Sequence, residues 1–386
     1  MNTEPSLLII TPSFAPEVGG VETRLNDICD HLQKKGIPTT VITYQPIITP
    51  ARGAAIEQRG SVTIHRHWWP GGDLFHRLLK FPVLEVAYLV PGLLFWSFVH
   101  LVAHRRSIRA VHTLGLNAAI AGRLLRPFFR FRWVVTTHAI YDFVAGSLLA
   151  RITRWVLTRA DSVLALSNVS RDELIRIGLS SARVETHVTW VNNQTRFVPQ
   201  DQAAVRRDLG WPDRFTVLFV GRMRANKGIG LLLAIARRRP EWTFAFAGGG
   251  EMLPEVETTS RELSILRVCG NLENDRLTPY YNAADVFIMP SQYSEGFGRV
   301  AIEALSCGIP IICSNRGGIK DHVSDDVAIM IDPEEMEIER ELARLADRPD
   351  ELAIRRKACR AFALEHFSEK NADQLVSAYF GNPTAN

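Results

Sequence analysis

The feature that most constrains the fold is an alternation of short apolar runs with segments of helical periodicity, which occurs twice along the 386 residues. Near the start, apolar runs at Leu7–Thr11 and Pro38–Tyr44 flank Val21–Lys35, whose apolar residues recur at helical spacing. A strand, a helix and a strand in this order predict a parallel unit with a right-handed crossover. The alternation starts again with a strand at Phe215–Gly221 and a helix at Ile229–Arg238. Two such sets predict an α/β protein with two doubly wound, Rossmann-like domains that face each other across a cleft.

We expect an N-terminal domain over residues 1–195 and a C-terminal domain over 196–369, because the polar stretch Asn192–Arg207 separates the two sets. The composition fits this picture: 46% of the residues are hydrophobic and 22% are charged, which excludes collagen-like, coiled-coil and largely disordered chains. The five cysteines are odd in number and form no C-x-x-C pair. This argues against a disulfide scaffold or a zinc ribbon.

Charge is distributed unevenly along the chain. Residues 1–196 contain 22 Lys and Arg against 13 Asp and Glu, whereas the remainder contains 23 against 28. A basic first half suggests an anionic partner, either a phosphate-bearing acceptor or a membrane surface. A nucleic acid is not expected, because the arginines are dispersed and no binding motif occurs. The first basic residue is Arg24 and the first apolar run is short, so we expect no signal peptide and a cytoplasmic protein, either free or peripheral on the inner face of the cell membrane.

The most apolar stretch is Val86–Ala103, which Arg105 and Arg106 follow. We expect Pro91-Gly92 to interrupt it, which favours a pair of packed core helices. The alternatives are an interfacial segment, in which residues 68–106 would contact the membrane, and a true membrane span.

The sharpest motif lies within Ser291–Gly318. Glu295 precedes Gly296, Phe297 and Gly298, a helix is predicted over Arg299–Ser306, and Glu303 lies one turn inside that helix. The first turn of a helix offers unpaired N–H groups and a positive dipole end, which suit a diphosphate. A carboxylate can accept hydrogen bonds from sugar hydroxyls, so both glutamates are candidate ligands. The alternative is a capped helix that carries two solvated glutamates.

Glycines and cations also follow two other strands of the second set. Gly221 ends a strand, and Arg222 and Lys227 occupy the loop that follows, where two cations could neutralise a diphosphate. Gly248 and Gly249 follow the next strand, where a nucleotide could lie against backbone. The loop is not a P-loop, because the G-x-x-x-x-G-K-[ST] pattern is absent, and solvated surface cations remain the alternative.

Two candidates lie in the first half. Gly20 opens the first helix and could approach phosphate, while His138 follows the strand Arg132–Thr137. A lone histidine is more often structural than catalytic, but the carboxyl end of a parallel strand is where sites occur.

Together these segments resemble the retaining nucleotide-sugar glycosyltransferases of family four (glycosyl transferases group 1), which have the two-Rossmann GT-B fold. The resemblance covers nearly the whole chain. Besides the Glu295–Glu303 motif, it rests on PEVGGVE (Pro16–Glu22), TTHA (Thr136–Ala139), ADSVLALSNVSRDEL (Ala160–Leu174), GRMRANKG (Gly221–Gly228), AGGG (Ala247–Gly250) and AADVFIMPS (Ala283–Ser291).

The resemblance implies a role for each candidate. Arg222 and Lys227 would bind the donor diphosphate, and Glu303 the ribose. Glu295 would bind the donor sugar, His138 would face the transferred sugar, and Gly20 the phosphate. It also implies that a helix near residues 370–386 packs back on the N-terminal domain. The family usually reads P-N-G-V-D where this chain has Val191–Thr195, which leaves donor positioning there open.

The predicted reaction is transfer of a glycosyl unit from a nucleoside-diphosphate sugar to a lipid-linked or saccharide acceptor, with retention, in synthesis of cell-envelope polysaccharide, lipopolysaccharide or glycolipid. No D-x-D triplet occurs, so we expect neither a metal nor a cofactor. A nicotinamide-dependent oxidoreductase is disfavoured, because G-x-G-x-x-G is absent and the second strand ends in Thr43-Tyr44-Gln45 rather than an acid. A nucleotide-sugar epimerase and a catalytically silent binding subunit remain as alternatives.

Overall fold

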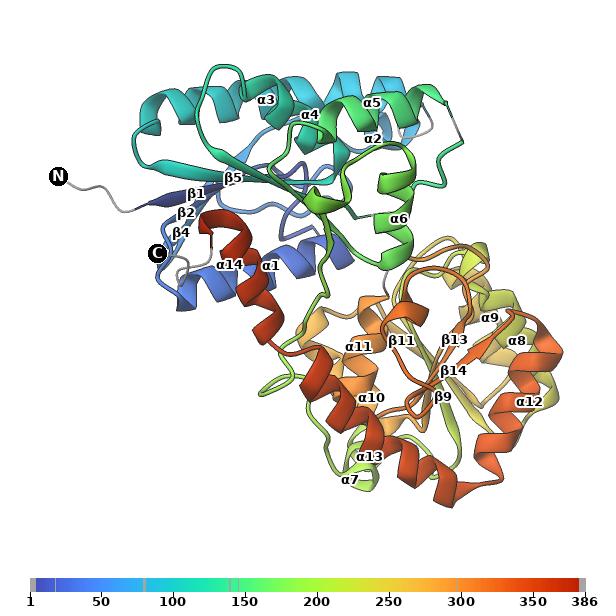
Figure 1. Ribbon diagram of the computed structural model, residues 1–386. Helices are drawn as coiled ribbons and strands as arrows, with labels where there is room; N and C mark the ends of the chain where they lie inside the picture. The colour runs from blue at the N-terminus through green and yellow to red at the C-terminus, as the bar shows by residue number, and fades with distance from the viewer. Residues whose placement is uncertain are drawn as a thin grey trace. The chain divides into compact units, whose positions relative to one another are not determined.

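The computed structural model describes residues 5–17, 19–78, 81–138, 140–144, 146–296 and 298–381. Two compact units are present (Figure 1). The first comprises the described residues up to Thr189 together with those from Lys370 onward, and the second comprises Trp190–Glu369. The units therefore divide at 189/190, a few residues before the boundary expected from the sequence. Each unit contains a sheet of parallel strands flanked by helices, which confirms the predicted α/β class and two-domain architecture.

The sheet of the first unit has the strand order β3-β4-β2-β1-β5-β6-β7-β8. Neighbouring strands are parallel except β3, which runs antiparallel to β4. The strands are β1 (Ser6–Ile10), β2 (Thr39–Tyr44), β3 (Ile56–Arg59), β4 (Val62–His67), β5 (Ile108–Leu114), β6 (Arg132–Thr136), β7 (Ser162–Ala165) and β8 (Val184–Thr186). The two edge strands, β3 and β8, were not predicted, because β3 is largely polar and β8 is only three residues long.

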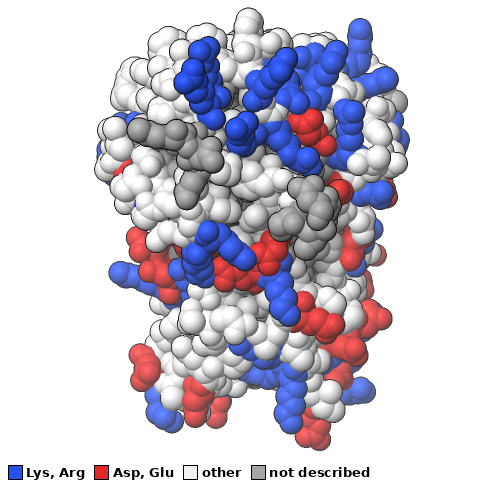
Figure 2. All heavy atoms as spheres, turned by 60° about the vertical axis from the view of Figure 1, so that its left-hand side comes forward, with Lys and Arg blue, Asp and Glu red and all other residues white. Residues whose placement is uncertain are grey.

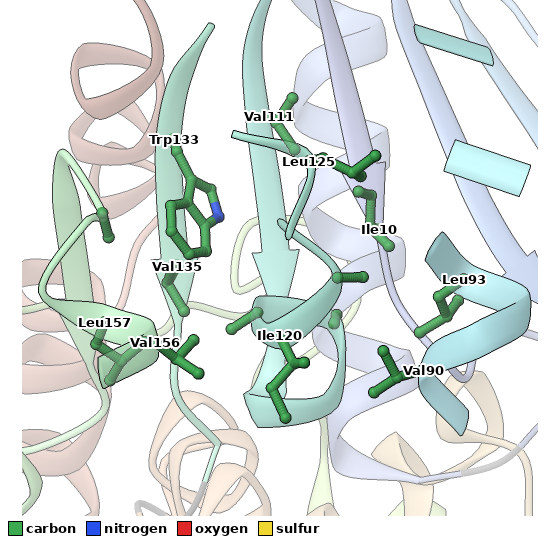
Figure 3. Packing of buried hydrophobic residues seen from close by; sticks show 14 of the residues in the cluster. Ile10, Val90, Leu93, Val111, Ile120, Leu125, Trp133, Val135, Val156 and Leu157 are labelled. Carbon is green, nitrogen blue, oxygen red and sulfur yellow. The ribbon is translucent and has the colours of Figure 1, made fainter. Parts of the chain in front are cut away.

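Helices cover both faces of this sheet (Figure 1). On one face lie α3 (Pro82–His104), α4 (Gly115–Leu125) and α5 (Leu148–Leu157), and on the other lie α1 (Gly20–Lys34) and α14 (Lys370–Phe380); α2 (Asp73–Leu78) and α6 (Asn168–Arg176) complete the unit. The core between the sheet and α3–α5 includes Trp133 and Val135 of β6 and Val90 and Leu93 of α3 (Figure 3). Helix α14 is tied to the sheet by the Tyr379 hydroxyl, which lies 2.8 Å from Nδ1 of His112.

The expected interruption at Pro91-Gly92 is wrong, because α3 is one continuous helix of 23 residues. Beside Pro91, the Tyr44 hydroxyl donates to the Leu89 carbonyl (2.6 Å) and accepts from the Leu93 N–H (2.8 Å). These two groups would otherwise bond each other in the helix, so the tyrosine is inserted into the backbone ladder. Gly92 leaves room for it, since a Cβ at this position would lie 2.4 Å from the hydroxyl.

The sheet of the second unit has the order β11-β10-β9-β12-β13-β14, and its paired strands are parallel. The strands are β9 (Thr216–Val220), β10 (Thr243–Ala247), β11 (Leu266–Gly270), β12 (Val286–Met289), β13 (Ile311–Ser314) and β14 (Ala328–Ile331). The helices are α7 (Gln202–Leu209), α8 (Ile229–Arg238), α9 (Leu253–Glu262), α10 (Thr278–Ala283), α11 (Arg299–Ser306), α12 (Glu335–Ala346) and α13 (Pro349–His366). This is the doubly wound order whose switch point lies between the first and fourth strands, here β9 and β12, where such sheets bind ligands.

A buried ionic network fixes the amino ends of the two central strands. Asp285, just before β12, accepts hydrogen bonds from the Thr216 N–H and from Arg206 of α7, both at 2.7 Å. The side chains of Arg206 and Asp285 are only 7% and 11% exposed. Because Asp285 joins the amino ends of β9 and β12, the two strands start side by side, and their carboxyl ends lie at the same edge of the sheet.

Candidate functional site

The first cations of the site follow β9. Gly221 follows the strand directly, and the chain then passes through Arg222 to a short 3-10 turn, η2 (Ala225–Lys227), before α8 begins. The Arg222 side chain is exposed, and no hydrogen bond or ion pair engages it within the described residues. It is thus available to an anion at the carboxyl end of the sheet.

The loop after β12 lies against this turn. The Gln292 N–H donates to the Asn226 carbonyl at 2.8 Å, which joins the two loops at the switch point. The loop is also held on its other side, because the Gly318 N–H donates to the Glu295 carbonyl at 2.8 Å. Glu295 is therefore fixed through its backbone beside the β9–α8 turn.

Lys227 and Glu295 form an ion pair at this position. Lys227 Nζ lies 2.7 Å from Glu295 Oε1, and the two side chains are 18% and 10% exposed. The Ser291 hydroxyl donates to the same carboxylate oxygen, and the ring centroid of Tyr293 lies 5.1 Å from Nζ. Burial alone would lower the pKa of Lys227, but the Glu295 charge and hydrogen bond outweigh it, so the pKa is raised. Lys227 is therefore a cation at neutral pH, and any diphosphate that binds it competes with Glu295.

The glycines after β10 differ in what they do. Gly248 has a φ of 132°, and a Cβ on it would lie 2.0 Å from the Gly221 carbonyl oxygen, so this position needs glycine for backbone packing alone. A Cβ on Gly249 would meet only the Asn271 side chain, at 3.8 Å. Packing therefore explains Gly248 but not Gly249, which leaves Gly249 as the better candidate for close approach by a ligand.

Helix α11 begins at Arg299, as predicted, directly after Gly298. Phe297 of the predicted motif lies outside the described residues, whereas Gly296 and Gly298 flank it in the loop after β12. The Val300 N–H in the first turn has no acceptor among the described residues. This end of the helix offers the donor and dipole that an anion needs.

Glu303 is placed differently from the expectation. Its side chain is 1% exposed, and Oε1 accepts hydrogen bonds from Asn274 (2.8 Å) and Arg299 (3.0 Å), while Oε2 accepts one from the Tyr281 hydroxyl (2.9 Å). Burial raises its pKa, although Arg299 and the other donors act in the opposite direction. In this arrangement Glu303 ties α10 and α11 together, and a ribose could use it fully only if one of these donors moved. Its role toward ribose stays a prediction.

His138 lies in the first unit, at the carboxyl end of β6 and close to Gly115 at the start of α4. Its Nε2 is buried and has no partner in the described part of the chain. Burial, followed by the charge of Arg24, lowers the pKa of His138 to about 3. His138 is therefore neutral at pH 7 and can donate or accept a hydrogen bond but cannot supply positive charge.

Gly20 begins α1 and has open space around its Cα, so steric fit does not explain a glycine there.

Sequence reasoning missed two residues that define the surroundings of His138. Arg24 is 5% exposed, and its Nη2 lies 2.6 Å from Nδ1 of His187. Glu173 of α6 accepts hydrogen bonds from the Tyr141 and Phe143 N–H groups, each at 2.9 Å, and so shapes the segment that follows His138. Both residues stand close to motifs quoted above, but nothing in their local sequence indicates which groups they contact.

A family described as "Glycosyl transferases group 1" matches residues 201–363, and a "Glycosyl transferase 4-like domain" matches residues 19–190. The chain belongs to the group 1 glycosyltransferases. This confirms the resemblance drawn from the motifs of both halves. Within the described residues, this glycosyltransferase contains no group of three or more His, Cys, Asp or Glu side chains that could hold a metal ion.

Curated relatives agree with this assignment. The chain is 36% identical over 188 residues to D-inositol 3-phosphate glycosyltransferase 2 of Catenulispora acidiphila, covering 44% of each protein. It is 28% identical over 331 residues to sulfoquinovosyl transferase SQD2 of Arabidopsis thaliana, covering 83% of this chain and 61% of that one. These matches therefore span about half the length of the relatives.

Among solved structures, sucrose-phosphate synthase from Thermosynechococcus elongatus has a TM-score of 0.79 at 24% identity, covering 97% of this chain and 98% of that one. Anabaena HepE in complex with UDP-glucose has a TM-score of 0.76 at 18% identity, covering 96% and 98%. At such identities the likeness establishes the shared fold.

Proposed function

We propose that this glycosyltransferase moves a sugar from a nucleoside-diphosphate sugar to an acceptor hydroxyl with retention of the anomeric configuration. The observation that carries the proposal is the cluster at the switch point of the second unit: the exposed Arg222, and Lys227 paired with Glu295. Two cations at the carboxyl end of β9 suit a diphosphate, and a carboxylate beside them suits a sugar hydroxyl. The solved relative that binds UDP-glucose supports the same class of donor.

In the proposed reaction, the bond between the sugar C1 and the diphosphate oxygen breaks, and a bond from C1 to the acceptor oxygen forms on the same face. The acceptor proton passes to the leaving phosphate. Arg222, Lys227 and the first turn of α11 would stabilise the negative charge that develops on the diphosphate. Because these groups supply positive charge, we propose a reaction that needs neither a metal ion nor a cofactor. Retention is supported by the family resemblance.

We further propose that His138, being neutral, donates or accepts a hydrogen bond at the transferred sugar, and that Gly20 faces phosphate.

The acceptor would be a lipid-linked or saccharide molecule of the cell envelope, and the enzyme would act in the cytoplasm. The basic first half of the chain supports an acceptor or surface that carries negative charge.

A thermal-shift screen against UDP, GDP and ADP would first identify the base, because a ligand that binds only the native state raises the melting temperature. Purified protein would then be incubated with the matching nucleotide sugars and membrane extract. We expect a donor-dependent product whose anomeric configuration equals that of the donor, and loss of product with Lys227→Ala. Donor turnover without acceptor would instead indicate an epimerase. Binding without turnover of any donor would indicate a silent subunit.

A further inference from the structure

One side of α3 is open to solvent and is apolar from Leu84 to Val102. Its exposed positions follow the three- and four-residue spacing of a single helix face, and no charged residue occurs between Glu85 and Arg105. The outer face of a helix in a water-soluble protein is normally polar. The exposed residues of the stripe are Leu84 (48%), Ala87, Pro91, Phe95 (56%), Phe98 (42%), Val99 (46%) and Val102 (53%). Val83 (64%) and Ala103 extend the exposed apolar surface, and His104, in the last turn, is the exposed polar residue among the described side chains of the helix.

The opposite side of the same helix is bound to the first unit. Leu89, Val90 and Leu93 are at most 6% exposed and belong to the core cluster. Figure 3 shows Val90 and Leu93 in this packing. The Trp69 indole also donates to the Tyr88 carbonyl at 3.1 Å. The helix is long and apolar enough to cross a membrane, with one third of its most apolar window buried. Because its inner side packs on the sheet, it is suited to lie in a membrane surface with only the outer side in lipid.

The apolar exposure continues over the neighbouring helices. Helix α4 contacts both α3 and α5, and the three cover one face of the sheet (Figure 1). Four large apolar side chains on or just after α4 and α5 are exposed, and together with the α3 residues above they define what we call the α3–α5 surface: Leu124 (39%), Phe128 (74%), Leu148 (61%) and Trp155 (48%).

The charges of this segment are mostly positive. Residues 82–161 contain ten arginines, no lysine and three acidic residues, Glu85, Asp142 and Asp161. Two of these acids are already engaged: Glu85 accepts a hydrogen bond from Asn117, and Asp161 pairs with Arg126 at 3.0 Å. In the upper part of Figure 2, Lys and Arg side chains are more prominent than Asp and Glu side chains. Arg132 is exposed but donates to the Ala378 carbonyl of α14, on the other face of the sheet. The other exposed arginines of the segment are Arg105, Arg106, Arg109, Arg130, Arg151, Arg154 and Arg159.

We propose that the α3–α5 surface docks on an anionic lipid bilayer, with the apolar stripe of α3 in the boundary between headgroups and acyl chains and the arginines on lipid phosphates. Apolar side chains gain by leaving water, and each arginine near an anionic surface adds attraction. A second copy of the chain is a poorer occupant, because a two-fold interface would bring the same excess of arginines face to face. The proposal concerns binding alone and does not depend on sugar transfer.

Vesicle flotation tests this directly, with vesicles of phosphatidylcholine alone or with about one-third phosphatidylglycerol. We expect the full-length protein to float with the anionic vesicles at low salt and to be released as salt rises. The double variant Phe95→Gln/Phe98→Gln should bind at least about ten-fold more weakly. Arg105→Gln/Arg106→Gln should lose about ten-fold at low salt and show a shallower salt dependence. Ile354→Gln, which removes a 70% exposed apolar side chain from α13 in the second unit, is the matched control and should bind like the wild type.

Far-UV circular dichroism and melting temperatures would show that each variant is folded. The proposal is overturned if the wild type stays in the soluble fraction with anionic vesicles at low salt. It is also overturned if the variant Phe95→Gln/Phe98→Gln floats to the same extent as the wild type. A third contrary result would be a wild-type dimer by light scattering that the same variant converts to a monomer while vesicle binding is absent, since the surface would then bind a second copy. No sugar donor is present, so these outcomes are independent of the proposed transfer reaction.

Discussion

The ion pair between Lys227 and Glu295 leads to opposite expectations for its two members. In the free protein, Nζ already has a carboxylate partner at 2.7 Å, so a diphosphate must replace one charge-assisted hydrogen bond with another. Such bonds contribute about 1.5–3 kcal/mol. The bond from Lys227 to the diphosphate forms at the expense of its bond to Glu295, so only part of this energy contributes to binding. We therefore expect Lys227→Met to weaken nucleoside-diphosphate binding by about 1.5 kcal/mol, or roughly ten-fold. Glu295→Gln replaces the competing carboxylate with a neutral amide, so it should tighten binding by about 1 kcal/mol, or roughly five-fold.

Isothermal titration with UDP, GDP and ADP would measure both effects, and Lys357→Met, which removes an exposed lysine from α13, provides the control. Glu295→Gln should at the same time reduce sugar transfer, because the carboxylate proposed to hold the sugar is lost. Unchanged affinity of Lys227→Met for every nucleotide would show that Lys227 is no diphosphate ligand. If Glu295→Gln weakened binding as much as Lys227→Met, the idea of competition within the pair would be wrong.

Three further predictions concern stability. Asp285→Asn should lower the stability of the second unit by about 3 kcal/mol, because Arg206 loses its buried carboxylate partner and keeps only the exposed Asp213; urea unfolding followed by tryptophan fluorescence would measure this. Tyr44→Phe removes the hydroxyl inserted in α3 and should cost about 1–3 kcal/mol, seen as a lower melting temperature. Burial, with a smaller contribution from neighbouring histidines, lowers the pKa of His67 and of His100 to about 4. As pH falls, these histidines are protonated in the unfolded chain at a higher pH than in the folded protein. The free energy of unfolding should therefore decrease from about pH 6.5 to about pH 4, by at most about 3 kcal/mol per histidine. Melting temperatures of His67→Gln/His100→Gln should fall less steeply over this range, and an unchanged slope would contradict the assignment.

Local signals were sufficient to predict much of the second unit. Helix α8 (Ile229–Arg238), strand β12 (Val286–Met289) and helix α11 (Arg299–Ser306) have the bounds expected from the sequence. Continuous apolar runs mark strands buried on both faces, and glycine or proline ends the helices, so neighbouring residues carry the information. The same reasoning failed at α3, where Tyr44, far away in the sequence, bonds the backbone groups of Leu89 and Leu93 on either side of Pro91.

The sequence by itself determined that glycines, cations and carboxylates would follow β9 and β12, because parallel strands bring their carboxyl ends to one edge of a sheet. Only the tertiary structure decided how these groups are engaged. It pairs Lys227 with Glu295 and encloses Glu303 between Asn274, Tyr281 and Arg299. It also leaves the apolar side of α3 uncovered, although the composition of the helix is equally consistent with a buried core. Burial and pairing depend on which distant segments pack together, and a local pattern of residues does not carry that information.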